Sequence, residues 1–225
     1  MKTKFERILI LGGTKEAAAM AQRLVDEGHH VITSLAGRTK EPKPLAGEVR
    51  IGGFGGVNGL IDYLNAQRLD RLIDATHPFA KQISANAIEA AQRAGVRLEM
   101  KTRPPWRPLQ GDDWIKVEGL SAAADAIPTH ARVLLALGSQ HLAAFHHRDD
   151  AFFLIRMVDA PPKPLPFANH KLLLGRPAME VEQEQNIMER HAITHIVCRN
   201  SGGTGAYAKI EAARALGLPV IMIKR

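Results

Sequence analysis

Residues 7–14, Arg7-Ile8-Leu9-Ile10-Leu11-Gly12-Gly13-Thr14, join an apolar run to a pair of glycines. Apolar residues at helical spacing follow over residues 15–27, and Gly28 is placed to cap the end of that helix. A buried strand that turns through glycines into a helix presents free N–H groups at the positive end of the helix dipole, where anions bind. The segment therefore predicts an α/β fold in which Gly12-Gly13-Thr14 cradles a phosphate. Taken alone, it also fits a tight turn without a ligand.

Strands and helices are predicted to alternate along the rest of the chain. In the first half, strands are predicted at residues 30–34, 49–51, 71–75 and 96–100, and helices at 57–66 and 80–94. After the proline-rich residues 103–108, strands are predicted at 114–117, 133–137, 152–157, 195–198 and 220–223, and helices at 121–127, 179–191 and 206–216. This alternation is typical of parallel sheets covered by helices. We predict two Rossmann-like α/β domains with parallel sheets, residues 1–112 and 113–225, and an interdomain cleft.

The composition favours a soluble protein with an aliphatic core. Of the 225 residues, 45% are hydrophobic but only 5% are aromatic, which suits parallel sheets under alanine-rich helices. No apolar stretch approaches the roughly 20 residues that span a bilayer, and residues 1–5 do not resemble a signal peptide. The single Cys198 excludes an internal disulfide and fits a reducing compartment. We therefore expect a cytoplasmic protein that is not bound to a membrane.

The formal net charge of +7 indicates an anionic partner. Nucleic acid would fit such a charge, because basic surfaces neutralise phosphates. However, the basic residues are spread along the chain, without a run of Lys and Arg and without interleaved aromatic residues on which bases stack. We therefore predict a small polyanionic substrate together with a phosphorylated cofactor, and no nucleic acid.

The end of the second predicted strand indicates which cofactor the first turn would take. An NAD site has an acidic residue there for the ribose 2′-hydroxyl, whereas an NADP site has a cation for the 2′-phosphate. This chain has Ser34 and Arg38 there, and the first carboxylate after that strand is Glu41. A hydroxyl and a bidentate guanidinium suit a phosphate, so we predict NADPH. A merely solvent-exposed Arg38 is the alternative.

Two further segments follow predicted strands of the first domain. Gly52-Gly53-Phe54-Gly55-Gly56 has four glycines, an entropic cost that a plain connection does not need. Because ligands bind at the carboxyl ends of parallel strands, we expect this segment beside the cofactor, with a flexible loop as the alternative. Thr76-His77-Pro78-Phe79 places a hydroxyl and an imidazole near the predicted nicotinamide position. A structural His77 that caps the following helix fits equally well.

The second half repeats the design of strand, glycine turn and helix. Asn200-Ser201-Gly202-Gly203-Thr204-Gly205 offers N–H groups and hydroxyls, followed by Tyr207 and Lys209, and suits carboxylates or a phosphate. Gly138-Ser139-Gln140-His141 is a weaker copy, and both segments also fit ordinary turns. Cys198 is expected to be buried in its strand. The histidines lack the spacing of metal ligands, so no metal is predicted.

Together these segments resemble the precorrin-6A reductase family of vitamin B12 biosynthesis. The resemblance rests on Gly12-Gly13-Thr14 with Glu16, on residues 52–56, and on the more specific Thr-His-Pro-Phe and Asn-Ser-Gly-Gly segments with Lys209. It implies two α/β domains with the substrate between them, and reduction by NADPH of one carbon–carbon double bond of precorrin-6A to give precorrin-6B. It also implies a polycarboxylate tetrapyrrole substrate, which fits the positive charge, and neighbouring corrin-pathway enzymes as candidate partners.

The expected site residues divide by role. The candidate catalytic residues, as proton donors, are His77, Tyr207 and Lys209, with solvent as the alternative. The expected cofactor contacts are Gly12, Gly13, Thr14, Ser34, Arg38, Gly52, Gly53, Gly55 and Thr76. The expected substrate contacts are Ser139, Ser201, Gly202, Gly203 and Thr204. These assignments make the first domain the NADPH-binding domain and the second the substrate-binding domain.

Other functions fit parts of the pattern. A non-catalytic NADPH-binding sensor would use the same two glycine turns, but it does not need His77 and Lys209 at one site. A methyltransferase that uses S-adenosylmethionine would normally have an acidic residue after the second strand, and this chain has none there. The sequence leaves open whether the tetrapyrrole carries cobalt.

Overall fold

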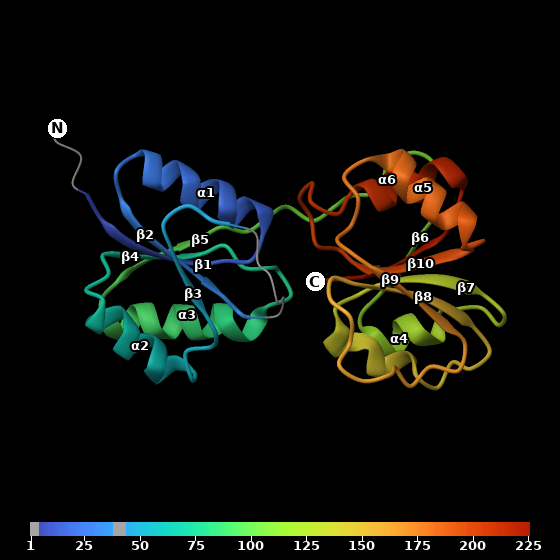
Figure 1. The fold of residues 1–225 in the computed structure, drawn as a ribbon, viewed down its shortest axis with the longest axis horizontal. Coiled ribbons are helices and arrows are strands. Elements are labelled where there is room, and N and C mark those ends of the chain that lie inside the picture. The colour runs from blue at the N-terminus through green and yellow to red at the C-terminus, as the bar shows by residue number, and fades with distance from the viewer. Residues whose placement is uncertain (1–4, 38–43) are drawn as a thin grey trace. The chain divides into compact units, whose positions relative to one another are not determined.

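The computed structural model describes residues 5–37 and 44–225, which form two compact units, Met1–Arg103 and Pro104–Arg225. Each unit is an α/β domain with a parallel sheet (Figure 1). The prediction of two parallel α/β domains is therefore confirmed.

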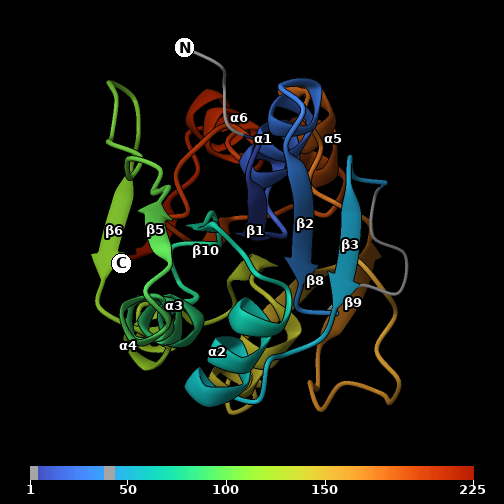
Figure 2. The same ribbon diagram turned by 90° about the vertical axis from the view of Figure 1, so that its left-hand side faces the viewer.

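The first unit is a five-stranded sheet in the order β3-β2-β1-β4-β5. Its strands are β1 (Arg7–Leu11), β2 (His30–Leu35), β3 (Glu48–Ile51), β4 (Arg71–Asp74) and β5 (Arg97–Met100). Its helices are α1 (Lys15–Asp26), α2 (Val57–Ala66) and α3 (Lys81–Ala94). All neighbouring strands are parallel, and β3 lies at the outer edge beside β2 (Figure 2).

Alternation along β1 explains why helices cover both faces of this sheet. Ile8 and Ile10 point to one face and pack with the apolar side of α1. Leu9 and Leu11 point to the other face and pack with α2 and α3. Successive residues of a strand face opposite ways, so a strand that is apolar at every position needs cover on both sides. Figure 1 shows α1 on one face and α2 with α3 on the other.

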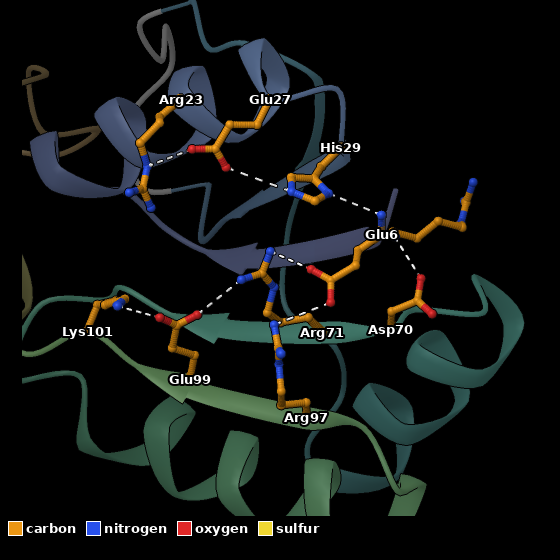
Figure 3. A network of polar contacts seen from close by, with 10 residues as sticks. Glu6, Arg23, Glu27, His29, Asp70, Arg71, Arg97, Glu99 and Lys101 are labelled. Atoms are coloured by element: carbon orange, nitrogen blue, oxygen red, sulfur yellow. Dashed lines mark hydrogen bonds and ion pairs between the residues drawn. The ribbon is translucent and has the colours of Figure 1, made fainter. Parts of the chain in front are cut away.

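The amino ends of β1, β4 and β5 are joined by ion pairs (Figure 3). Arg71 bonds to Glu6 at 2.6 Å and to Glu99 at 3.4 Å, and Arg97 also bonds to Glu6, at 3.3 Å. Lys101 pairs with Glu99, and this hydrogen bond, followed by the charges of Lys101, Arg71 and Arg97, lowers the pKa of the Glu99 carboxyl. The pairs of Glu6 with Arg71 and Arg97 thus hold the amino ends of β1, β4 and β5, whereas Glu99 and Lys101 extend the network along β5 to its carboxyl end.

The second unit is a six-stranded parallel sheet in the order β6-β11-β10-β7-β8-β9. Its strands are β6 (Trp114–Val117), β7 (Arg132–Ala136), β8 (Phe152–Met157), β9 (His170–Leu174), β10 (His195–Arg199) and β11 (Val220–Ile223). The helices α5 (Val181–Arg190) and α6 (Ala208–Leu216) pack together on one face, as Figure 1 shows. On the other face lie α4 (Leu120–Asp125) and the 3₁₀ helix η1 (Ser139–Phe145).

The boundary between the units differs from the predicted one. The chain divides after Arg103, so residues 104–112 belong to the second unit and not to the first. Trp106 is only 9% exposed in the core of the second unit, and Asp112 is held by Arg214, with Oδ1 2.9 Å from Nε. The proline-rich composition of residues 103–108 is typical of a linker, but the buried Trp106 side chain makes residues 104–112 part of the second unit.

Two local predictions also need correction. The strand β9 was not predicted, because none of its five residues is fully buried, with three half-buried and two exposed, and its sequence has no clear alternation. The turn at Gly138 leads into a 3₁₀ helix and not an α-helix. Within the part of the chain that the structure describes, no helix is long and apolar enough to span a membrane.

Candidate functional site

The turn after β1 has the geometry of an anion cradle. Gly13 has φ +101°, which favours glycine, and a Cβ there would meet nothing within 4 Å. Gly12 lies against the sheet, since a Cβ would stand 2.8 Å from Thr33 Cγ2. The helix α1 begins directly afterwards, so the first N–H groups of the helix have no acceptor within it. The turn is therefore both open to a ligand and polarised to receive an anion.

Thr14 holds this turn in place. Its hydroxyl accepts a hydrogen bond from the Ala17 N–H at 3.1 Å and donates one to the Ala75 carbonyl at 2.9 Å. Thr14 is therefore the N-cap of α1. Because the Thr14 hydroxyl donates its proton to the Ala75 carbonyl, a phosphate would bind Thr14 through the backbone N–H.

The ends of β2 and β3 bring a hydroxyl and a guanidinium together. Ser34 is buried and lies opposite Arg50 in the register of the two strands. Arg50 Nη1 stands 3.4 Å from Ser34 Oγ, and the same guanidinium donates to the carbonyls of Gly52 and Gly53. Arg38, the cation expected here from the sequence, lies outside the described residues.

Residues 53–56 of the four-glycine segment line a cavity of about 340 Å³. Its other wall is formed by residues 79–83 and Asn86, at the start of α3. Gly56 and Ala80 are the N-caps of α2 and α3, and neither helix start has a side-chain cap. Phe54, Phe79 and Ile83 supply apolar surface, while the helix starts supply N–H groups. Such a hollow suits a flat ring that carries polar atoms.

The segment after β4 is fixed by its own hydrogen bonds. The Asp74 carboxylate, which is 3% exposed, accepts from both the backbone N–H and the hydroxyl of Thr76 through Oδ1. His77 Nδ1 accepts from the Phe79 N–H at 3.3 Å. His77 therefore fixes this loop and does not cap α3, whose N-cap Ala80 has no side-chain cap, and a role towards a ligand stays a prediction. The Thr76 hydroxyl proton is likewise used within the chain.

The second glycine turn, after β10, is filled by the protein itself. The Asn200 side-chain amide accepts from the Trp106 N–H at 2.7 Å and donates to the Trp106 carbonyl at 2.9 Å. The Trp106 indole donates to the Gly203 carbonyl at 2.7 Å. A Cβ on Gly202 would stand 2.2 Å from the Pro104 carbonyl oxygen. This turn binds residues 104–106, whereas Ser201 and Thr204 remain partly or fully exposed.

Lys209 and Tyr207 are used inside the second unit. The Lys209 amine is buried, donates to the Ala206 carbonyl at 2.6 Å and lies 5.0 Å from the centre of the Trp106 ring. Burial lowers the pKa of this amine. The Tyr207 hydroxyl accepts from Arg214 at 3.0 Å. The predicted role of Lys209 as a proton donor therefore conflicts with its burial, since no ligand reaches its amine without movement of the helix.

Two arginines at the carboxyl edge of the first sheet, Arg50 and Arg103, were not identified from the sequence. Arg50 was overlooked because it lies inside a strand and not after one, although alternation places it on the same face as Glu48 and away from Ile51. Arg103 donates to Glu16 at 3.0 Å and so neutralises a carboxylate in the first turn of α1, which would otherwise repel an anion in the cradle. That contact joins residues 87 positions apart, so no local pattern reveals it.

No group of three or more metal-ligating side chains occurs among residues 5–37 and 44–225. Cys198 is buried, as predicted, and burial raises the pKa of its thiol. Ser139 is exposed at the start of η1, in the second unit. The predicted cofactor contacts that the structure describes therefore all lie at the carboxyl edge of the first sheet, and the predicted substrate contacts all lie in the second unit.

Comparison with known proteins agrees with this geometry. The model of the family described as "Precorrin-6x reductase CbiJ/CobK" matches residues 7–225. The chain belongs to this family. The resemblance found in the glycine, Thr-His-Pro-Phe and Asn-Ser-Gly-Gly segments is thereby confirmed.

Individual relatives match this chain over nearly its whole length. A protein of Rhodobacter capsulatus named precorrin-6A reductase is 46% identical over 97% of this chain and 88% of its own length. A solved structure titled "CobK precorrin-6A reductase" has a TM-score of 0.95 and 46% identity, covering 98% of this chain and 88% of that one. A protein of Priestia megaterium named cobalt-precorrin-6A reductase is 26% identical over 97% of this chain and 90% of its own length.

Proposed function

We propose that this member of the precorrin-6x reductase family uses NADPH to reduce one carbon–carbon double bond of precorrin-6A, giving precorrin-6B in cobalamin biosynthesis. The observation that carries the proposal is the 46% identity, over 97% of this chain, to a protein named precorrin-6A reductase. The chain also has the parts that such a reaction needs: an open phosphate cradle and a ring-sized hollow at one sheet edge.

The residues of the first unit fit a dinucleotide phosphate. The N–H groups of Gly13 and of the first turn of α1 would bind the pyrophosphate, and the space beside Gly13 lets it approach the backbone. The 2′-phosphate would lie by Ser34, with Arg38 as a candidate cation. Bound there, NADPH supplies the hydride, and the protein supplies orientation and exclusion of water. Gly52, Gly53, Gly55 and Thr76 would line the path beside the dinucleotide.

The second unit is proposed to bind the macrocycle through its carboxylates. Ser139, Ser201 and Thr204 keep exposed or half-exposed hydroxyls for this role. The net charge of +7 favours a polyanionic substrate. The cobalt-free tetrapyrrole is the proposed form, because identity is 46% to a protein named precorrin-6A reductase and 26% to one named for the cobalt substrate.

A proton must reach the carbon next to the one that receives the hydride. His77 is the proposed donor among the described residues, because it follows β4 at the carboxyl edge of the first sheet. Its acid form is the imidazolium, so Nδ1 must take up a proton and give up the hydrogen bond from the Phe79 N–H before the ring can donate. Tyr207 is a less suited donor, because its ring packs against Trp106 and its hydroxyl is held by Arg214, within the second unit. Solvent is the alternative donor. A cytoplasmic location and contact with neighbouring corrin-pathway enzymes belong to the same proposal.

The test is a reaction of purified protein with NADPH and precorrin-6A. We expect loss of the NADPH absorbance and a tetrapyrrole product heavier by two hydrogens, with slower turnover for NADH and for the cobalt substrate. Binding of NADPH without its oxidation on either tetrapyrrole would contradict the reductase proposal and favour a sensor. His77→Gln and His77→Ala, assayed across pH, distinguish a donor from solvent: a donor role predicts loss of the basic limb of the rate profile.

A further inference from the structure

Arg50 is the last but one residue of β3 and lies at the carboxyl edge of the first sheet. Its Cα partner across the strand pair is Ser34, the last but one residue of β2. Figure 2 shows these two strands side by side, with β3 at the edge. The 2′-position of a dinucleotide ribose lies at the end of the second strand in this type of fold. Arg50 therefore reaches the expected position of a 2′-phosphate from the neighbouring strand.

The guanidinium of Arg50 is held rigidly. Nη1 donates to the Gly52 carbonyl at 2.6 Å and Nη2 donates to the Gly53 carbonyl at 2.8 Å. The guanidinium carbon lies 3.9 Å from the centre of the Phe54 ring and 5.2 Å from that of Tyr63. A planar cation fixed by two carbonyls and a ring loses little side-chain entropy when it binds a ligand.

The charge of Arg50 is not balanced by a carboxylate among the described residues, within ion-pair distance. Arg71, in the same sheet, is paired with Glu6 and Glu99, and Arg103 is paired with Glu16. Contacts with described residues use three of the five N–H donors of the Arg50 guanidinium, counting the 3.4 Å approach to Ser34 Oγ. Donors remain for an anion, and Ser34 keeps its own hydroxyl proton for the same anion.

We propose that Arg50 determines the cofactor specificity of this protein by binding the 2′-phosphate of NADPH together with Ser34. The proposal rests on the proposed use of NADPH. The carbonyls of Gly52 and Gly53 orient the guanidinium towards Ser34. The glycine segment would therefore help to bind the phosphate by positioning Arg50, in addition to any contact of its own backbone. NADH, which has a hydroxyl at the 2′-position, gains no ion pair from this cation.

Binding measurements on Arg50→Met and Arg50→Lys test this assignment. Calorimetry with the whole protein would compare NADPH with NADH, and adenosine 2′,5′-bisphosphate with adenosine 5′-monophosphate. We expect Arg50→Met to weaken NADPH and the bisphosphate by about 10- to 100-fold, the range of a charge-assisted hydrogen-bonded contact. NADH and the monophosphate should change by less than about threefold, since they lack this contact. Arg50→Lys keeps the positive charge but lacks the planar guanidinium that donates two hydrogen bonds at once, so its loss of NADPH affinity should be intermediate.

Arg132→Met is the matched control. Arg132 also donates to a carbonyl, that of His191, and stacks 4.1 Å from the centre of the Phe152 ring, but it lies in the second unit. It should leave all four affinities unchanged. Equal losses of affinity for NADPH and NADH in both Arg50 variants would overturn the proposal and would mean that Arg50 only supports the glycine segment. Unchanged NADPH affinity in these variants would overturn it as well.

The same experiment separates the two proposals. If the unaltered protein oxidises NADPH with precorrin-6A but the Arg50 variants keep the preference for NADPH, only the role of Arg50 fails. If the unaltered protein binds neither dinucleotide, the proposed function fails, and with it the ligand assigned to Arg50. Arg38→Ala, measured in parallel, shows whether the two arginines share the phosphate: additive losses indicate two independent contacts.

Discussion

The tripeptide Gly-Gly-Thr occurs in both halves of the molecule, as Gly12-Gly13-Thr14 after β1 and as Gly202-Gly203-Thr204 near the end of β10. In the first turn the threonine caps α1, and the space beside Gly13 is open. In the second, α6 begins only at Ala208, and the space beside Gly202 is filled by the Pro104 carbonyl and by Arg225. The first turn is open, whereas the second already holds a part of its own chain.

The difference shows that a glycine pair marks close approach of a backbone without saying what approaches. Glycine is needed in both places, because Gly13 has φ +101° and Gly202 has φ +64°. At Gly13 the approaching group is proposed to be a phosphate. At Gly202 it is the proline-rich segment, which Asn200 holds through two hydrogen bonds to Trp106. The Asn-Ser-Gly-Gly segment thus fixes the start of the second unit.

The largest effect is expected for Gly202→Ala. A methyl group there would clash with the Pro104 carbonyl and would force alanine into the left-handed region, so we expect a loss of about 3 kcal/mol or more in the free energy of unfolding. Both tryptophans, Trp106 and Trp114, lie in the second unit, so urea unfolding followed by tryptophan fluorescence reports on this unit. Gly205→Ala, where a Cβ would have open space, is the control. Equal stability of the two variants would refute the clash.

A smaller loss is expected for Asn200→Ala. It leaves the N–H and carbonyl of Trp106 without their partner, which costs about 2 kcal/mol when such groups are buried. Asn169→Ala removes one hydrogen bond at the surface of the same unit and should cost well under half as much. Tryptophan fluorescence again follows the transition, and a red-shifted emission of the folded Asn200 variant would indicate that Trp106 has left its site.

The first turn should respond in affinity more than in stability. In Gly13→Ala the added methyl group meets no protein atom, so the free energy of unfolding should fall only by the backbone strain of about 1–2 kcal/mol. The same methyl group would block the phosphate, so NADPH affinity should fall by about 10-fold or more. Gly95→Ala carries the same kind of strain at the C-cap of α3, with open space beside it, and should bind NADPH normally. Full NADPH affinity in the Gly13 variant would mean that the cradle is not used.

The smallest effect on catalysis is expected for Lys209→Met. The amine is buried and bonded to Ala206, so turnover and its pH profile should change by less than about threefold, because no proton-transfer step is removed. Because burial lowers the pKa of Lys209, the unfolded state binds more protons than the folded state below the ordinary value of 10.5, and stability rises as the pH rises towards it. This rise should be weaker in the variant. A hundredfold loss of turnover would restore Lys209 as a catalytic residue.

Much of the fold could be predicted from local patterns. The apolar residues of β1 and the glycine turn after it required a parallel α/β sheet, and the helix at residues 57–66 has its predicted bounds. The strand β9 was missed because its five residues have little periodicity and its burial depends on β8 beside it. The domain boundary was misplaced for a similar reason, since Trp106 is anchored by residues about 95 positions away.

The sequence by itself determined the family, the alternation of strands and helices, and where glycine is required, because each of these depends on residue type and spacing. Only the tertiary structure decided which glycine turn stays open, that Lys209 is buried, and that Arg50 stands beside Ser34. Those outcomes depend on groups that meet across strands or from distant segments. A local pattern can state that a backbone must be approached closely; the packed chain determines whether a ligand or the protein itself fills the space.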